Sequence, residues 1–598
     1  MFQSFSATSS PDQGPPRLKA LRAKMADAAV DAFLVTRADA HQGEYVAHCD
    51  ERLAWLTGFT GSAGFAAVTQ DIAGVFIDGR YRLQVRQQVA DEFTPVHWPE
   101  TRLSDWLVEN LPSGASVGID PWLHTVKEVR ALDKALSDKS ITLTAIDNLV
   151  DAIWDDRPER PREPLLVHDD AIAGETSDSK RARLAEGLRS AGQSAAVLTL
   201  PDSICWLLNV RGADIPRTPL AQGFAILSSD ASVKFFTNAT ANEAVLEHLG
   251  KSVELLPYDG LLPALKTLKG SVLIDPSTAP EAVRRTLADQ SGVDTVEGAE
   301  PCVLPKARKT DAEIDATKEA HLRDGAAMVE FLAWFDKTAP KGGVTEISAA
   351  QALEGFRRAT NALHDISFDT ISGAGPNGAI VHYRVTEGTN RAVQNNELYL
   401  VDSGGQYVDG TTDITRTVVV GEATDEQKDC FTRVLQGMIA ISVARFPRGV
   451  AGRDLDALAR APLWRVGRDY DHGTGHGVGV FMAVHEGPQR LSRISEVALE
   501  PGMILSNEPG YYREGAFGIR IENLIVVRQA AEMGDGRDQL SFENLTWAPI
   551  DLRLVDAASL APFEREWLND YHSQVRDKLA SRVSSEAQDW LIAATRTI

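Results

Sequence analysis

The sequence contains little cysteine and no long apolar run, and each absence excludes a class of protein. Its four cysteines are Cys49, Cys205, Cys302 and Cys430, and no two of them form a C-x-x-C pair. A disulfide scaffold and a thiolate zinc site are therefore excluded, and a reducing compartment is indicated. No apolar stretch approaches the roughly 20 residues of a membrane helix, and the N-terminus lacks a basic segment that leads into an apolar run. We expect a cytoplasmic protein that does not enter a membrane.

Positive charge is also scarce. The chain has 61 Lys and Arg residues against 84 Asp and Glu residues, which gives a formal net charge of -23. Such a chain repels polyanions unless a basic patch intervenes, and we identify no such patch in the sequence. We therefore expect no binding of nucleic acid or of an anionic membrane surface.

The chain is long enough for roughly three or four domains, and its first half contains a repeat. The segments "LRAKMADAAVDAFLVT", "LAWLTGFTGSAGFAAVT" and "GVFIDGRY" are matched further along by "LAEGLRSAGQSAAVLTL", "ICWLLNVRG" and "GFAILS". Each copy predicts a helix, an apolar strand, a Trp-centred strand and a Gly-Phe-Ala strand. We expect two tandem α/β domains, residues 1–158 and 159–309, divided near the proline-rich segment 155–164.

The third region begins with a predicted helix over residues 310–335, where Thr310 and Glu313 have the spacing of a capping box. From Ala379 onward strands are predicted at "AIVHY", "ELYLVD", "TVVV", "MILSNE" and "GIRIENLIVV". The segment "FEREWLNDYHSQVRDKLA" predicts a helix near the end of the chain. We expect a third domain over residues 310–535 and a packed extension over 536–598.

Four acidic residues of the third region lie at or within apolar strands, and one histidine lies in a Gly-rich loop. They are Asp402, Asp413, Glu508, Glu522 and His476. Four clustered carboxylates would raise one another's pKa values and destabilise the fold, whereas two divalent cations would neutralise their charge. An oxygen-rich set with one imidazole suits manganese, cobalt or iron, with zinc as an alternative.

Each of these residues also has a structural interpretation when it is taken alone. An Asp after a strand is more often part of a turn, and we keep that interpretation for Asp409, which precedes a glycine. Arg520 and Glu522 would share one face of a strand, so a simple salt bridge could account for that pair. The number of acids in apolar strands is what favours a metal site.

Two motifs are misleading when read by their letters. His472 and His476 are four residues apart, but Gly, Thr and Gly separate them and no Glu follows the first His, so a zinc-protease helix is not predicted. The segment "GAGPNG", residues 373–378, matches G-x-G-x-x-G. A dinucleotide site would need a helix after this motif, whereas "AIVHY" predicts a strand. We interpret it as a loop that lets backbone approach a substrate.

The combined motifs resemble those of a known family. The segments "VDSGGQYVDGTTDITRT", "GHGVG", "VHEGP", "SNEPGYY" and "IRIEN", with "DAHQGEYVAHCDERLAWLTGFTGSAG" in the first domain, are similar to the pita-bread metallopeptidases of the long, three-domain Xaa-Pro aminopeptidase (aminopeptidase P) type. The resemblance covers nearly the whole chain. It implies an α/β (α+β) fold with two tandem creatinase-like N-terminal domains, a pita-bread catalytic domain and a C-terminal extension.

The resemblance also implies roles for the five candidate ligands. Asp413 and Glu522 would bridge two metal ions, Asp402 would chelate one of them, and His476 and Glu508 would complete the other. Glu508 would in addition act as the proton shuttle for a bridging hydroxide. The implied cofactor is a pair of divalent ions, with Mn²⁺ expected and Co²⁺ or Zn²⁺ as alternatives.

Other residues are implied to act on the substrate, a peptide with proline at its second position. His382 and His485 would contact the substrate and stabilise the tetrahedral intermediate, while His472 and Arg520 would line the pocket. Arg80, in "DGRY", would hold the peptide at the entrance, with a structural ion pair as the alternative. Family likeness also implies a homodimer.

These expectations define one leading hypothesis and three alternatives. The leading hypothesis is a metal-dependent aminopeptidase that cleaves between an N-terminal residue and a following proline. Prolidase, which acts on Xaa-Pro dipeptides, shares the ligands, but the duplicated N-terminal domains argue against it. A non-catalytic peptide-binding scaffold would lack several ligands, and creatinase-like amidinohydrolysis would not use the dimetal set.

Overall fold

A computed structural model describes residues 1–532, 534 and 536–598, and the chain forms two compact units. Unit 1 comprises Met1–Ala7, Ala171–Gly174 and Leu304–Ile598, and unit 2 comprises Thr8–Asp170 and Glu175–Val303. The first seven residues therefore belong with the unit that contains the candidate ligands. The finer division into four domains remains a prediction.

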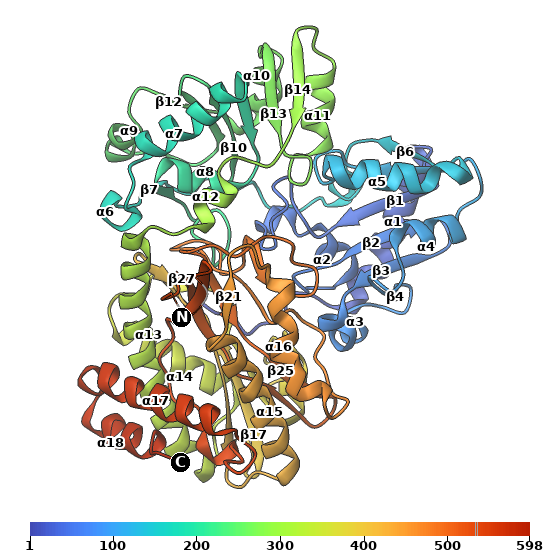
Figure 1. Cartoon of the computed structure of the whole chain (residues 1–598). Coiled ribbons are helices and arrows are strands. Elements are labelled where there is room, and N and C mark those ends of the chain that lie inside the picture. The colour runs from blue at the N-terminus through green and yellow to red at the C-terminus, as the bar shows by residue number, and fades with distance from the viewer. Residues whose placement is uncertain (533, 535) are drawn as a thin grey trace. The chain divides into compact units, whose positions relative to one another are not determined.

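Unit 2 contains two six-stranded sheets with the same topology (Figure 1). The first has the order β4(Thr94–His97)-β3(Ala73–Ile77)-β2(Phe65–Thr69)-β1(Ala32–Thr36)-β5(Ser116–Ile119)-β6(Thr142–Ala145). The second has the order β12(Val253–Leu256)-β11(Val233–Thr237)-β10(Gly223–Ser228)-β8(Ala195–Leu198)-β13(Gly270–Ile274)-β14(Val293–Glu297). Corresponding pairs also have the same direction, since β1·β2 and β8·β10 are antiparallel and β1·β5 and β8·β13 are parallel. The predicted repeat is confirmed as a structural duplication.

Helices cover both faces of the first sheet. Successive side chains of a strand point in opposite directions, and the apolar residues of β1 therefore need a cover on each side. Phe33 and Val35 of β1 pack with Leu21 of α1 (Gly14–Asp27). Ala32 and Leu34 pack on the other face with helices α4 (Leu103–Asn110) and α5 (Val126–Leu136). The result is the predicted α/β layer.

The two Trp-centred segments were predicted as strands, and this prediction is wrong. They form helices α2 (Arg52–Thr57) and α8 (Pro201–Leu208). All but one residue of α8 is buried, so its apolar residues show no helical period. A short apolar run that is buried on every side looks the same for a strand and a helix.

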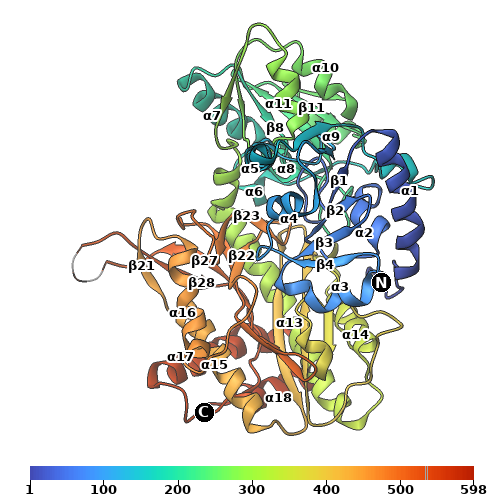
Figure 2. The same ribbon diagram turned by 90° about the vertical axis from the view of Figure 1, so that its right-hand side faces the viewer.

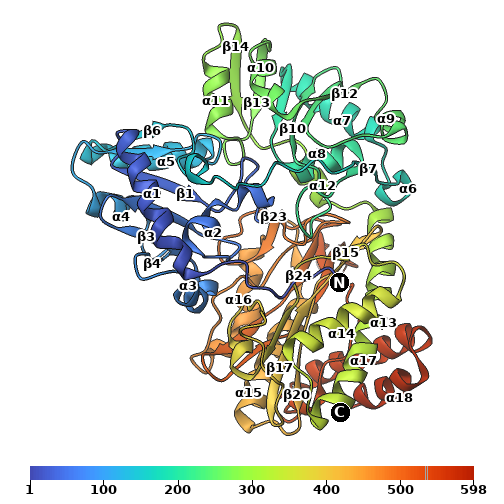
Figure 3. The same ribbon diagram turned by 180° about the vertical axis from the view of Figure 1, so that it is seen from behind.

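Unit 1 has two principal sheets, each covered by helices. The sheet β16(Ile371–Ala374)-β17(Glu397–Ser403)-β20(Ile414–Val420) packs against α13 (Asp311–Thr338) and α14 (Glu346–Ala359) (Figure 3). The other sheet has the order β21(Arg445–Pro447)-β28(Gln539–Asn544)-β27(Asn523–Gln529)-β24(Ile504–Asn507)-β22(Gly475–Gly477)-β23(Glu486–Leu491) (Figure 2). Helices α15 (Asp425–Ser442) and α16 (Gly452–Trp464) pack on it. The terminal helices α17 (Pro562–Leu579) and α18 (Ser585–Ala594) pack beside α13.

The helix predicted over 310–335 is confirmed as α13, and its capping box is present because the Thr310 side chain and the Glu313 side chain each bind the other residue's backbone amide. One strand prediction is wrong, and another strand is divided in two. The "AIVHY" segment is not a strand: the 3-10 helix η8 (Gly375–Ala379) precedes a turn, and the buried Glu346 carboxylate accepts hydrogen bonds from Asn377 and Tyr383 across that turn. The "GIRIENLIVV" segment splits into β26 (Phe517–Arg520) and β27, with Glu522 between them.

No described helix has the length and apolar character needed to cross a membrane. The four cysteines are all free and buried.

Candidate metal centre

Strand pairing explains why the distant acidic residues converge. Asp402 is near the end of β17, and its register partner on β20 is Thr415, so Asp413 just before β20 lies at the same end of the sheet. In the other sheet β24 pairs with β27 through Asn507 and Asn523. Glu508 follows the first of these residues and Glu522 precedes the second, so both acids extend from one end of the pair.

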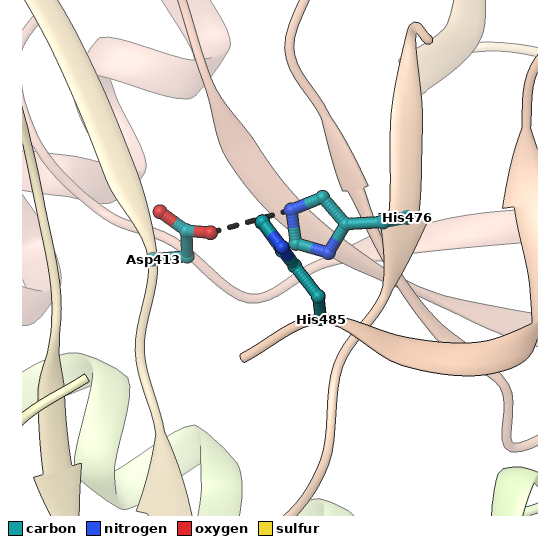
Figure 4. A group of neighbouring side chains, drawn as sticks. All are labelled: Asp413, His476 and His485. Atoms are coloured by element: carbon teal, nitrogen blue, oxygen red, sulfur yellow. Dashed lines mark ion pairs between the residues drawn. The ribbon is translucent and has the colours of Figure 1, made fainter. Parts of the chain in front are cut away.

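In the described part of the chain, side chains that could bind a metal form three overlapping groups. Within each group the ligand atoms all lie within 4.8 Å of one another. The groups are Asp402, Asp413 and Glu522; His476, Glu508 and Glu522; and Asp413, His476 and His485. His476 Nε2 lies 3.4 Å from Asp413 Oδ2 and 3.4 Å from Glu508 Oε1. Figure 4 shows Asp413, His476 and His485 pointing toward one another. All five residues predicted as ligands are therefore in one cluster.

The electrostatics of this cluster fit a site for cations. Burial, with the neighbouring carboxylates, raises the pKa values of Asp413 and Glu522 well above their usual range. Burial also raises the pKa of Glu508 to about 7. Asp402 Oδ1 and Glu522 Oε1 are buried and have no hydrogen-bond partner among the described residues. Since a buried carboxylate oxygen without a partner is costly, this oxygen-rich donor set suits divalent cations.

A hydrogen-bonded chain leads away from Asp402. Arg520 Nη2 donates to Asp402 Oδ2 at 2.6 Å, and Nη1 donates to the Tyr512 hydroxyl at 2.6 Å. That hydroxyl lies 2.9 Å from His472 Nε2. Burial raises the pKa of Tyr512 to about 12, so the phenol stays protonated at neutral pH. The Arg520–Glu522 salt bridge considered from the sequence is not formed, because the ion-pair partner of Arg520 is Asp402.

Two of the four candidate histidines, His476 and His485, lie in the ligand groups, and the other two, His472 and His382, lie outside them. His476 Nδ1 lies 3.0 Å from the Gly477 carbonyl, which leaves Nε2 to face the carboxylates. The ring of His485 packs against that of His476 with centroids 4.2 Å apart. His472 lies outside the three groups found among the described residues. His382 is half-buried and follows Val381, whose carbonyl accepts a hydrogen bond from Arg520 Nη2 at 3.4 Å.

Two hydroxyl residues that the sequence did not single out hold the carboxylates. Thr415 Oγ1 donates to Glu522 Oε2 at 2.8 Å and accepts from Arg520 Nε at 3.2 Å. Ser506 Oγ donates to Glu508 Oε1 at 3.1 Å and accepts from the His476 amide at 2.9 Å. Thr415 is two residues from Asp413 and Ser506 is two residues from Glu508. Strand alternation, which places such residues on one face, was the signal that could have found them.

Arg80 lies in unit 2, where it forms an ion pair with Asp78 at 2.7 Å and contacts the ring of Tyr81. Its interactions in that unit are those of a structural ion-pair residue. A contact between Arg80 and a substrate stays a prediction.

Comparison with known proteins identifies the family of the chain. Residues 315–529 match the model of metallopeptidase family M24, residues 17–153 and 156–313 each match a creatinase/prolidase N-terminal domain, and residues 538–598 match the C-terminal region of peptidase M24. The chain is 40% identical to Aminopeptidase P2 of Arabidopsis thaliana over 95% of this chain and 86% of that protein. It is 39% identical to a probable Xaa-Pro aminopeptidase P of Laccaria bicolor, over 96% of this chain and 92% of that protein.

A solved structure is similar over almost its full length. It is the X-prolyl aminopeptidase of Caenorhabditis elegans, described as a cytosolic enzyme with a di-nuclear active site. Its TM-score is 0.92 at 34% identity, and the match covers 98% of this chain and 99% of that chain. The chain therefore belongs to metallopeptidase family M24, among the long aminopeptidase P proteins with two creatinase/prolidase N-terminal domains.

Proposed function

We propose that this protein is a dimetal aminopeptidase that removes an N-terminal residue preceding proline. The observation that carries the proposal is the cluster of four carboxylates and His476, in which Asp402 Oδ1 and Glu522 Oε1 are buried and have no partner within the described residues. Relatives that match most of the chain are named Aminopeptidase P2, probable Xaa-Pro aminopeptidase P and X-prolyl aminopeptidase, which supports the substrate class.

Asp402, Asp413, His476, Glu508 and Glu522 would hold two divalent cations. Asp413, Glu522 and His476 each belong to two of the three ligand groups, and of these three residues the two carboxylates have a second oxygen with which to bridge a pair of cations, which supports their assignment as the bridging residues. When bound, such a pair of cations supplies Lewis-acid chemistry that activates water and polarises the peptide carbonyl. Mn²⁺ is the expected metal, because the donor set is mostly oxygen.

Glu508 is the proposed proton carrier. Glu508 belongs to one of the ligand groups, so its carboxylate lies where a proton of the attacking water could be taken up. Cleavage before proline leaves a secondary amine, which must be protonated as the C–N bond breaks. In our proposal Glu508 takes a proton from the attacking water and delivers it to that nitrogen. Ser506 holds one oxygen of Glu508 and so fixes the direction of the carboxyl group.

Several further assignments belong to the same proposal. His485 and His382 contact the peptide and stabilise the tetrahedral intermediate, and His472 and Arg520 line the pocket. The peptide amine binds close to the acidic ligands, which limits cleavage to one residue at a time. A homodimer and a cytoplasmic location complete the proposal.

The test is to strip the purified protein of metal with a chelator, restore Mn²⁺, and assay Arg-Pro-Pro. We expect release of the N-terminal Arg only after metal is restored. Absence of proline-dependent release with Mn²⁺, Co²⁺ and Zn²⁺ would refute the proposal. Comparing di- and tripeptide turnover separates it from prolidase, which prefers the dipeptide.

A further inference from the structure

A second buried ionic group lies directly beside the candidate centre in the sequence. Glu486, the residue after His485, forms ion pairs with two lysines: Lys306 Nζ lies 3.0 Å from Oε2 and Lys309 Nζ lies 2.5 Å from Oε1. The three side chains are 0%, 1% and 2% exposed. Lys309 Nζ also donates to the Lys306 carbonyl at 2.7 Å, so the two lysines are held together.

The backbone of Glu486 is fixed as well. It begins β23, and its register partner on β22 is Gly477, the residue after His476. A bulge separates His476 from Gly477 at this point, and the rings of His476 and His485 are in contact. Glu486 therefore connects the strand that carries His476 with the segment that carries His485.

Two of the three glycines of "GHGVG" border Glu486, whereas a Cβ on Gly475 would meet the Ser506 carbonyl oxygen. A Cβ on Gly477 would lie 2.4 Å from the Glu486 carbonyl oxygen, and a Cβ on Gly479 would lie 3.0 Å from Glu486 Oε2. Any side chain at Gly477 would displace Glu486. The motif that carries His476 is thus shaped to accommodate Glu486.

We propose that Lys306, Lys309 and Glu486 form a positioning group that fixes His485 against His476 for the peptidase reaction. Stability alone is a weak explanation for the group, because buried ion pairs can often be replaced by apolar residues without loss of stability. Lys309 hydrogen-bonds one carboxylate oxygen of Glu486 and Lys306 lies at ion-pair distance from the other, which restrains the Glu486 side chain and with it the backbone of the adjacent His485. The lysines lie at the start of unit 1, at the end of α12 (Val303–Ala307) and just before α13. This inference rests on the proposed function only where it refers to turnover.

The experiment compares Lys309→Met with the conservative Lys309→Arg and with a control, Lys180→Met. Lys180 is an equally buried lysine of unit 2, with Nζ bonded to the Trp206 carbonyl and to Asn209 Oδ1. Measurements are kcat and KM for Arg-Pro-Pro, bound Mn²⁺ per folded chain, and hydrogen–deuterium exchange of a peptide covering residues 480–491.

In Lys309→Met we expect kcat to fall by about tenfold or more with bound Mn²⁺ unchanged and KM changed by less than about threefold. Exchange of the 480–491 peptide becomes faster. Lys309→Arg restores kcat to within about threefold of the natural protein, because the charge is retained. Lys180→Met destabilises the protein but changes neither kcat per folded chain nor that peptide's exchange. The inference is overturned if Lys309→Met has the same kcat and the same exchange as the natural protein. It is also overturned if kcat falls only in proportion to the loss of bound metal.

If Lys309→Met does not fold, Lys306→Met decides, since it keeps the shorter of the two ion pairs, Lys309–Glu486. A kcat lowered by about threefold or more together with faster exchange supports the inference, and natural values overturn it. If the natural protein cleaves no Xaa-Pro peptide, the proposed function fails, and exchange alone decides: unchanged exchange in the folded lysine variants overturns the positioning role.

Discussion

Arg520 Nη2 lies 2.6 Å from Asp402 Oδ2, whereas Asp402 Oδ1 is buried and without a hydrogen-bond partner among the described residues. The guanidinium therefore occupies one oxygen of the carboxylate and leaves the other for a cation. Both side chains come from strand ends and are buried. A buried charge that loses its partner is strongly destabilising, so the two groups stay paired.

Replacing Arg520 by Met should weaken metal binding. We expect Mn²⁺ affinity to fall by about 10- to 100-fold, because Asp402 loses the partner that orients it. Isothermal titration of the metal-free protein with Mn²⁺ measures this change. Arg520→Lys keeps the charge but not the planar guanidinium, so its Mn²⁺ affinity should lie between those of the natural protein and Arg520→Met. Equal affinity in all three proteins would contradict the assigned role of the pair.

Glu508 should make the metal-free protein less stable as pH rises. Its pKa in the folded protein is about 7, above the ordinary 4.5, so the folded state binds more protons than the unfolded state between these values. Stability from this group is therefore full below about pH 4.5 and is lost as pH rises through 7, by up to about 3 kcal/mol. We expect the unfolding free energy of Glu508→Gln, relative to the natural protein, to rise from pH 5 to pH 8 in chelator. A pH-independent difference would contradict this.

His572 should have the opposite effect in acid. Burial, with Arg416 and Arg576 nearby, lowers its pKa to about 3, and its Nε2 accepts a hydrogen bond from the Ile550 amide. Because the unfolded chain protonates His near pH 6.5, this stability is full above 6.5 and is lost progressively as pH falls toward 3. His572→Gln keeps an acceptor but does not titrate. Between pH 7 and pH 4 the unfolding free energy of His572→Gln should fall by about 3 kcal/mol less than that of the natural protein, as measured by denaturant titration. Parallel pH profiles would show that His572 is not responsible.

Phe5 should stabilise the segment that carries His382. Its ring packs with Tyr383 and Val385 in one buried cluster, and its carbonyl accepts a hydrogen bond from the Glu387 amide at 2.9 Å. Phe5→Ala should lower the free energy of unfolding by about 2–3 kcal/mol and raise KM for Arg-Pro-Pro. Phe563→Ala is the control, because Phe563 is 53% exposed and its loss should change stability by less than about 0.5 kcal/mol. An unchanged KM in folded Phe5→Ala would separate the segment from substrate binding.

The sequence predicted the parts of the fold that local patterns determine. The repeat and the α13 capping box depend on residues close in the chain, and both are confirmed. The Trp-centred segments and "AIVHY" were wrong because burial and the contacts of Glu346 outweigh strand propensity there. These contacts join residues far apart in the sequence.

The same distinction applies to the candidate site. The five ligand candidates could be named because each is an unusual acid or histidine in an apolar or Gly-rich context, although their roles stay proposals. Thr415 and Ser506 were missed because hydroxyl residues are common in strands, and their importance depends on the side chain opposite. Lys306 and Lys309 could not have been paired with Glu486 from the sequence, since about 180 residues separate them and general patterns treat charged residues as solvated.

The most direct test of the account is a titration of metal-free protein with Mn²⁺ while turnover of Arg-Pro-Pro and bound metal are measured together. We predict that turnover is absent without metal and reaches its maximum at two ions bound per chain. Glu522→Gln, which alters a proposed bridging carboxylate, should bind fewer than two ions and stay inactive. Full turnover in the metal-free protein, or two ions bound by Glu522→Gln with natural activity, would contradict the account.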